Sequence, residues 1–196
     1  MDLAEQVVES FHHHIDCTMQ AIAPLSQALA DASELLVHAL LHEGKILCCG
    51  EGASGLLAQH FTETLLGRAD RERPALPALA LNDAAVLSGI ASANSYNDIF
   101  ARQLRALGQP RDAVLLIAHA TGTGATLQAL QAAHDRGLPV VVLCSESHGD
   151  LRALLAPEDI ELQVPQLSRA RFIETGLLAL NILSELIELQ LFGSEV

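Results

Sequence analysis

The sequence predicts an α/β fold, in which helices cover both faces of a five-stranded parallel sheet in three layers. Short, continuously apolar segments alternate with segments of helical periodicity, a pattern typical of parallel strands buried on both faces. Half of the residues are hydrophobic and only 3% are aromatic, which suits helices packed on a sheet of small aliphatic side chains. The expected strands cover residues 45–49, 78–81, 113–118, 139–144 and 159–164. The helices expected among and after them cover residues 54–67, 83–92, 97–107, 125–136, 148–155 and 169–191.

Two helices are expected before the first strand. Apolar residues recur at three- and four-residue spacing along the first one, at Leu3, Val7, Phe11, Ile15, Met19 and Ile22. Pro24 predicts a break, and a second helix over 26–42 is expected to end near Gly44, which suits a C-cap. We therefore expect an N-terminal helical oligomerisation segment over residues 1–43. An α/β domain over residues 44–196 follows, and the two form one structural unit.

The last helix, over 169–191, is apolar almost all round its circumference. A helix of this kind is buried on several sides. Together with the amphipathic first helix, it predicts packing between subunits, so we expect a homo-oligomer.

The charge and the cysteines restrict the possible partners and location. The net charge of −13 disfavours direct binding of nucleic acid or anionic membranes, since phosphate contacts need a basic patch. The four cysteines show no CxxC spacing and read as buried, reduced thiols of a cytoplasmic protein. The N-terminus has no signal-peptide pattern, and no apolar run is long enough to predict a membrane span.

Residues 45–55 are the most informative stretch for function. A buried strand is followed by a turn with Gly50 and Gly52 and then by a helix, which places free backbone N–H groups and a positive helix end together. This arrangement favours an anion such as phosphate. Ser54 suits either an anion donor or a helix N-cap. Glu51 stands in the same turn, where its carboxylate opposes an approaching phosphate.

The order of elements and several motifs resemble the sugar isomerase (SIS) domain, a flavodoxin-like fold. The similar branch contains phosphoheptose isomerases and replication-initiator-associating proteins of the DiaA type, and the resemblance covers nearly the whole chain. The residues that carry it are Lys45–Gly50 with Gly52 and Ser54, Ala58–Phe61, Arg73–Ala78, Gln103–Gly108, Gly122, Pro157–Glu161 and Leu191–Phe192. The family is known for homotetramers, in agreement with the helix patterns.

The resemblance also implies where isomerase members carry their catalytic residues. A helix holds His with Glu four residues later, and the last helix holds an Arg-x-Gln-Glu-x-His pattern, which in some members binds zinc. Here His60 is followed by Thr64, and the last pattern has Ile173 and Gly176 at its Gln and His positions. We expect no metal site and no cofactor, with zinc only if the protein is an isomerase after all. We expect no catalytic residue, with Glu63, one helical turn from His60, and His60 itself as weak candidates; a surface acid is the preferred interpretation of Glu63.

The resemblance further implies a phosphate-binding loop over 119–124. Thr121 and Thr123 keep two hydroxyls there, and His119 offers a cation if it is protonated. Arg68 matches an arginine near the family's site, and Glu51 replaces an asparagine of the first turn. The expected ligand-binding residues are therefore Glu51, Ser54, Arg68, His119, Thr121 and Thr123.

These departures from the isomerase pattern lead to a non-catalytic scaffold of the DiaA type as the preferred interpretation. The resemblance implies a cytoplasmic tetramer that binds the replication initiator DnaA and promotes its assembly at the origin. Leu191 and Phe192 are then candidates for an exposed partner contact, or else they close the oligomer core. The alternatives are a sedoheptulose 7-phosphate isomerase and a sensor that binds a phosphosugar without turnover.

Overall fold

The structure is a computed structural model that describes residues 2–67, 72–119, 123–145, 150–165 and 168–193. Within these residues, parallel strands form one five-stranded sheet in the order β2-β1-β3-β4-β5. The strands are β1 (Ile46–Gly50), β2 (Ala78–Ala80), β3 (Ala113–Ala118), β4 (Val140–Ser145) and β5 (Ile160–Val164). The predicted three-layer fold is confirmed, and each predicted strand is found within one residue of its expected bounds.

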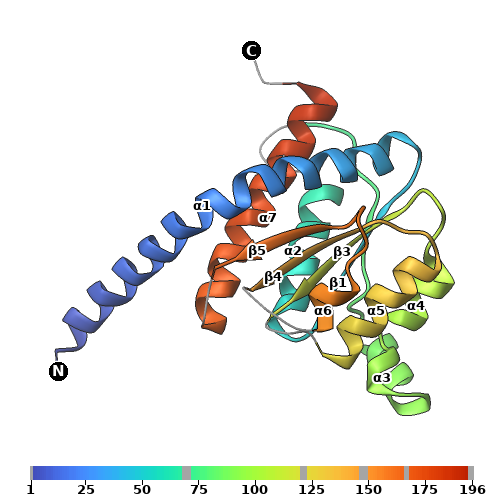
Figure 1. Cartoon of the computed structure of the whole chain (residues 1–196), viewed down its shortest axis with the longest axis horizontal. Helices are drawn as coiled ribbons and strands as arrows, with labels where there is room; N and C mark the ends of the chain where they lie inside the picture. Colours follow the sequence, from blue (N-terminus) through green and yellow to red (C-terminus); the bar gives the residue numbers. More distant parts are fainter. Residues whose placement is uncertain (1, 68–71, 120–122, 146–149, 166–167, 194–196) are drawn as a thin grey trace.

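Helices cover both faces of the sheet (Figure 1). One face carries α1 (Leu3–Leu41), α2 (Ala53–Leu66) and α7 (Arg169–Phe192). The other face carries α3 (Ala84–Ala93), α4 (Ala101–Leu107), α5 (Gly124–Asp135) and α6 (Asp150–Leu154), with the short 3₁₀ turn η1 (Tyr96–Asp98) before α4. Successive strand residues alternate between the two cores: Cys48 packs on the first face and Cys49 on the second. All four cysteines are buried, as expected, and none of them forms a disulfide.

The expectation of two N-terminal helices is wrong, because α1 is one continuous helix of 39 residues with Pro24 inside it. A proline removes one backbone N–H and frees the carbonyl four residues earlier. Here both Pro24 and Gln20 are exposed, so water can bind the freed carbonyl of Gln20. Packing stabilises the helix after Pro24, since Leu25 and Leu29 are buried in the core that α1 shares with α7 and the sheet.

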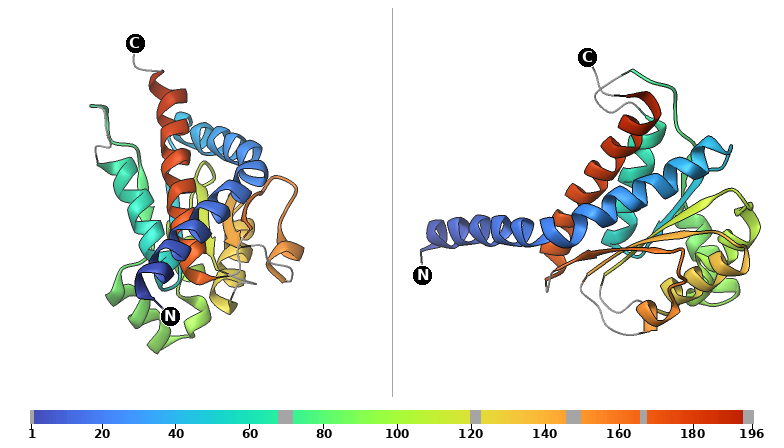
Figure 2. Two further views of the ribbon diagram at one scale, coloured as in Figure 1. Left: turned by 90° about the vertical axis from the view of Figure 1, so that its left-hand side faces the viewer. Right: turned by 45° about the horizontal axis from the view of Figure 1, so that its top comes forward.

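The first half of α1 extends away from the body of the molecule (Figures 1 and 2). Large apolar side chains on it are between 53% and 76% exposed, namely Leu3, Val7, Val8, Phe11, Ile15, Met19 and Ile22. The second half packs beside α7 and β5 and shares one core with the sheet. The expected division of the chain at residue 43 stays a prediction; the shared core agrees with one structural unit.

Gly44 is not the C-cap of α1 that the sequence suggested. The helix ends at Leu41 with His42 as its C-cap, and Glu43 takes the left-handed conformation, with φ 63°. The N–H of Gly44 donates to the carbonyl of Ala39 at 2.9 Å, which closes the helix end. Glycine is needed at position 44 because the carbonyl oxygen of Arg111 would lie only 2.0 Å from a Cβ.

In the part of the chain that the structure describes, none of the helices combines the length and hydrophobicity needed to cross a membrane.

Candidate functional site

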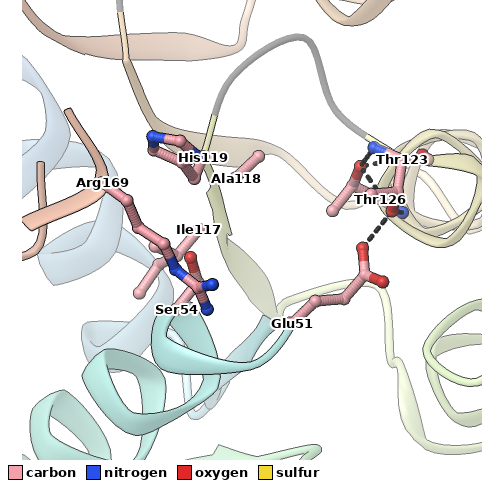
Figure 3. A pocket seen from close by; sticks show the side chains of 8 residues that line it. All are labelled: Glu51, Ser54, Ile117, Ala118, His119, Thr123, Thr126 and Arg169. Atoms are coloured by element: carbon pink, nitrogen blue, oxygen red, sulfur yellow. Dashed lines mark hydrogen bonds between the residues drawn. The ribbon is translucent and has the colours of Figure 1, made fainter. Parts of the chain in front are cut away.

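A hollow of about 170 Å³ lies at the carboxyl edge of the sheet, between the ends of β1 and β3 (Figure 3). From β1 the sheet continues to β2 on one side and to β3 on the other, so the following helices diverge at this point. Ligands of open α/β sheets bind at such a switch point. The side chains that line the hollow are Glu51, Ser54, Ile117, Ala118, His119, Thr123, Thr126 and Arg169.

The turn between β1 and α2 brings Glu51 and Ser54 to this edge. Gly52 is the N-cap of α2 and has a φ of 56°, a conformation that glycine adopts without strain. The interpretation of Ser54 as the N-cap is therefore wrong, because Ser54 lies one residue inside the helix. Its side chain is only 4% exposed and points into the hollow (Figure 3).

The start of α5 forms the opposite wall. Thr123 is the N-cap, and it forms a reciprocal capping box with Thr126, whose hydroxyl accepts from the N–H of Thr123 at 2.7 Å. The hydroxyl of Thr123 also donates a short hydrogen bond to the carboxylate of Glu51. The two loops are thus joined across the mouth of the hollow.

Tyr96, from η1, is a second neighbour of Glu51. Burial, the charge of Glu51 and a hydrogen bond between the two side chains raise the pKa of Tyr96. The carboxylate of Glu51 therefore interacts with a threonine hydroxyl and with a phenol.

His119 and Arg169 complete the hollow. The half-buried ring of His119 packs edge-on against Phe172 of α7, with 5.2 Å between ring centroids. Arg169 is the first residue of α7, and its guanidinium reaches across the turn, so that a Cβ on Gly52 would lie 3.1 Å from its Nη2. Sequence reasoning missed Arg169, Thr126 and Tyr96. The expected helix start at residue 169, following a strand that ends at this edge, was the available signal for Arg169.

The structure brings four of the predicted ligand-binding residues together: Glu51, Ser54, His119 and Thr123 line one hollow. Arg68 and Thr121 lie outside the described residues. The two weak catalytic candidates do not line the hollow. The Nε2 atom of His60 lies 2.8 Å from Oδ1 of Asn181 on α7, and Glu63 is exposed.

The surroundings of His60 do not fit zinc. The hydroxyl of Thr64, one turn further along α2, donates to the backbone carbonyl of His60 itself, and the nearest polar partner of the ring is the amide of Asn181. Among the residues described, no three His, Cys, Asp or Glu side chains gather where they could hold a metal ion. Zinc takes nitrogen, sulfur or carboxylate donors, three or four at a time. That the protein needs no cofactor stays a prediction.

The remaining pattern residues of α7 also lie outside the hollow. Nη1 of Arg171 is 2.5 Å from Oε2 of Glu174, and Nδ1 of His14 on α1 is 2.7 Å from the same oxygen. Gly176 faces the core, where a Cβ would meet Leu57 at 3.3 Å. A larger side chain at that position would press on Leu57 and Leu143.

Leu191 and Phe192 are partly buried against the core that α1, α2 and α7 share with the sheet. Both side chains also stay partly exposed, so a contact with a partner and the closing of an oligomer core both stay predictions.

The comparisons with known proteins place this chain in a family. The SIS domain model matches residues 10–145, and the chain belongs to the SIS domain family, in the branch of the phosphoheptose isomerases. The phosphoheptose isomerase of Chromohalobacter salexigens is 45% identical over 99% of both chains, and that of Alkalilimnicola ehrlichii is 43% identical over 98% of this chain and 99% of the other. A solved phosphoheptose isomerase from Francisella tularensis has a TM-score of 0.91 at 34% identity and covers 95% of this chain and 98% of its own.

These relatives correct the functional interpretation drawn from the sequence. The preference for a non-catalytic DiaA-type scaffold that binds DnaA is wrong, because proteins so similar over the full chain are phosphoheptose isomerases. The leaning against an enzyme is wrong for the same reason. It rested on Thr64 and Gly176, yet neither position faces the hollow between β1 and β3.

Proposed function

We propose that this protein is a phosphosugar isomerase that interconverts an aldose and a ketose phosphate, with a phosphoheptose such as sedoheptulose 7-phosphate as its substrate. The observation that carries the proposal is the hollow at the switch point of the sheet. It combines donors for an anion, on Ser54 and Arg169, with two groups able to move protons, Glu51 and His119. The relatives named above support the choice of a heptose phosphate.

The reaction moves a proton between two adjacent carbons through an enediol, so it needs a base and an acid within reach of the substrate. We assign the base to Glu51 and the acid to His119, which face the hollow from different sides (Figure 3). The carboxylate of Glu51 takes the proton from the carbon next to the carbonyl. The imidazole of His119, when protonated, donates to the carbonyl oxygen as the enediol forms. Thr123 and Tyr96 keep the carboxylate in place.

The test is the conversion of sedoheptulose 7-phosphate, followed by NMR, with and without added zinc and with a chelator. Wild-type protein is expected to turn the sugar over. Glu51→Gln and His119→Asn are each expected to lower kcat about a hundredfold or more, the usual worth of general acid–base catalysis. Glu63→Gln is the matched comparison, because Glu63 is exposed and outside the hollow. Its rate should equal that of the wild type.

Each other outcome counts against the proposal in a defined way. Binding of the sugar phosphate without turnover would overturn the isomerase and support a phosphosugar sensor. Loss of activity in Glu63→Gln but not in Glu51→Gln would move the base to α2. Activity abolished by the chelator and restored by zinc would show that a metal site forms from residues other than those assigned here.

We also propose a homotetramer in the cytoplasm. The exposed apolar face along the first half of α1 supports assembly, because such a face is covered in most proteins. Four cysteines without a disulfide support the cytoplasm, where disulfides are rare.

A further inference from the structure

Asn82 joins the end of β2 to the turn that carries Glu51. Where the pairing of β1 with β2 ends, the N–H of Leu81 donates to the carbonyl of Cys48 at 2.8 Å. Carbonyls alternate in direction along a strand, so the next carbonyl of β1 that faces β2 belongs to Gly50. It accepts from Nδ2 of the Asn82 side chain at 2.7 Å. The side-chain amide thus takes the place of a backbone donor at the point where the chain leaves the sheet.

The turn leaves no spare room around this hydrogen bond. A Cβ on Gly50 would lie 2.8 Å from the carbonyl oxygen of Ser54 and 2.9 Å from that of Ile117. A Cβ on Gly55 would lie 2.6 Å from Nδ2 of Asn82. The end of β1, the first turn of α2 and the amide of Asn82 are therefore in direct contact.

The bond to Gly50 acts on Glu51, because the carbonyl of Gly50 and the N–H of Glu51 belong to one planar peptide unit. A donor that fixes the carbonyl also fixes the direction in which the chain enters Glu51. At the far end of the same residue, the carboxylate interacts with Thr123 and with Tyr96. Glu51 is thus oriented through its side chain and through its backbone, and Asn82 acts on the backbone.

Stability alone does not explain an amide at position 82. The Oδ1 atom of Asn82 is buried and has no hydrogen-bond partner among the described residues. A buried acceptor without a partner is unfavourable, so the amide loses free energy at its oxygen while it donates from its nitrogen. What the side chain supplies is therefore the donor to Gly50, next to the residue that we assign as the base.

We propose that Asn82 is a positioning residue for the reaction: it orients Glu51 through the peptide unit of Gly50 and makes no contact with the substrate. The inference rests on the proposed function for the role of Glu51 as the base. Asn82 is not among the side chains that line the hollow, so its loss should change kcat and leave substrate binding as it is.

Tyr96 provides a probe of Glu51 that needs no turnover. It is the only tyrosine of the chain, which has no tryptophan, so the ultraviolet absorbance of tyrosinate reports on this one residue. Burial and Glu51 raise the pKa of Tyr96 above its ordinary value of 10.0. We expect Asn82→Ala and Asn82→Leu each to lower this pKa toward 10.0, because Glu51 is no longer held beside the phenol. Glu51→Gln is the positive control and should lower it in the same way.

Asp83→Ala is the matched control for this titration. Asp83 is the next residue along the chain, and its carboxylate caps α3 by accepting from the N–H of Val86 at 2.9 Å. Loss of the cap loosens the same exit from the sheet, yet the carbonyl of Gly50 keeps its donor. Asp83 is also not among the groups that raise the pKa of Tyr96, so this pKa should equal that of the wild type.

A kinetic test uses the conversion of sedoheptulose 7-phosphate. Asn82→Ala is expected to lower kcat about tenfold to a hundredfold with KM unchanged, as for a small misplacement of a catalytic group. In a Glu51→Gln background the same substitution should lower kcat no further. A residue that acts through Glu51 then has no base left to orient, whereas a general structural defect would add to the loss.

Three results would overturn the proposal. The first is a pKa of Tyr96 that stays at the wild-type value in both Asn82 variants. The second is an equal shift in Asp83→Ala, and the third is an equal loss of kcat from Asn82→Ala with and without Glu51. Asn82→Leu roughly keeps the volume of the side chain, so the titration stays decisive even if Asn82→Ala does not fold. A protein that shows the Tyr96 shift but no turnover would contradict the isomerase and still leave Asn82 as the residue that orients Glu51.

Discussion

Two adjacent residues of β1, Cys48 and Cys49, show how burial controls side-chain chemistry in this protein. Both side chains are fully buried, on opposite faces of the sheet. Burial raises the pKa of Cys48 from 9.0 to about 12, against a smaller opposite effect of a hydrogen bond with Thr62. Burial, with the nearby Cys48 and Glu51, also raises the pKa of Cys49. Since the thiolate is the reactive form, both thiols should be inert near neutral pH.

We therefore predict that iodoacetamide at pH 8 leaves both cysteines unmodified in the folded protein, and that both react after unfolding in urea. Peptide mass spectrometry measures this at each site. The raised pKa values have a second consequence. The folded state holds these protons more tightly, so the stability they contribute is complete below pH 9 and falls as the pH rises toward 12. Rapid labelling of either cysteine in folded protein would contradict this account.

The candidate site could be predicted from the sequence only where its residues follow strands closely. Glu51, Ser54, His119 and Thr123 come directly after β1 and β3, and parallel strands end at the same edge of a sheet. Tyr96 could not be placed, because its interaction with Glu51 depends on packing that no local pattern encodes. The partner of His60 is likewise remote: Asn181 is 121 residues away, across the contact between α2 and α7.

At the scale of secondary-structure elements, the strands were the most predictable part. Short, continuously apolar segments that alternate with helical segments are typical of buried parallel strands. The error at Pro24 has a physical cause. Proline is unfavourable inside an isolated helix, but α1 gains more from burying Leu25, Leu29 and Leu36 than it loses at one exposed carbonyl. The unfavourable effect of a proline inside a helix can be predicted from the sequence, whereas the contacts that compensate for it exist only in the folded molecule.

Two glycines, one after α1 and one inside α3, should respond in opposite ways to substitution by alanine. Gly44→Ala should lower the free energy of unfolding by about 1–3 kcal/mol, because its Cβ would lie 2.0 Å from the carbonyl oxygen of Arg111. Gly89→Ala should raise it by about 0.5–1 kcal/mol, because Gly89 lies inside α3 with no heavy atom within 4 Å of a Cβ. Urea denaturation of both variants measures the two changes. If Gly44→Ala were as stable as the wild type, the close approach of Arg111 would not limit this junction.

At the scale of the whole molecule, fold and function were not equally predictable. The sheet order places one hollow at the switch point whichever residues line it, so the fold indicates where a ligand binds. The sequence argument for a lost activity compared single positions with a family pattern. Gly176 faces the core, and the hydroxyl of Thr64 donates to a carbonyl of its own helix. Neither residue lines the hollow, so neither shows which chemical groups are present there. Function depends on which side chains the whole fold brings together.

The whole molecule is expected to assemble through the first half of α1. The apolar face of α1, defined by Leu3, Val7, Val8, Phe11, Ile15, Met19 and Ile22, stays largely exposed within the described residues of the chain. Phe11 lies in its middle and is 66% exposed. Burying such a side chain in a subunit contact contributes about 1.5–3 kcal/mol. We expect Phe11→Asp to lower the mass of the assembly, as measured by light scattering during size-exclusion chromatography.

His13→Asp provides the matched control for this experiment. His13 is exposed and lies two positions from Phe11, so the helical repeat places it on the opposite side of α1. The same negative charge there should leave the assembly intact, because the contact is made by the apolar face. A normal mass for Phe11→Asp would show that the subunits meet elsewhere. Dissociation of both variants would mean that charge on α1, rather than loss of the apolar contact, disrupts the oligomer.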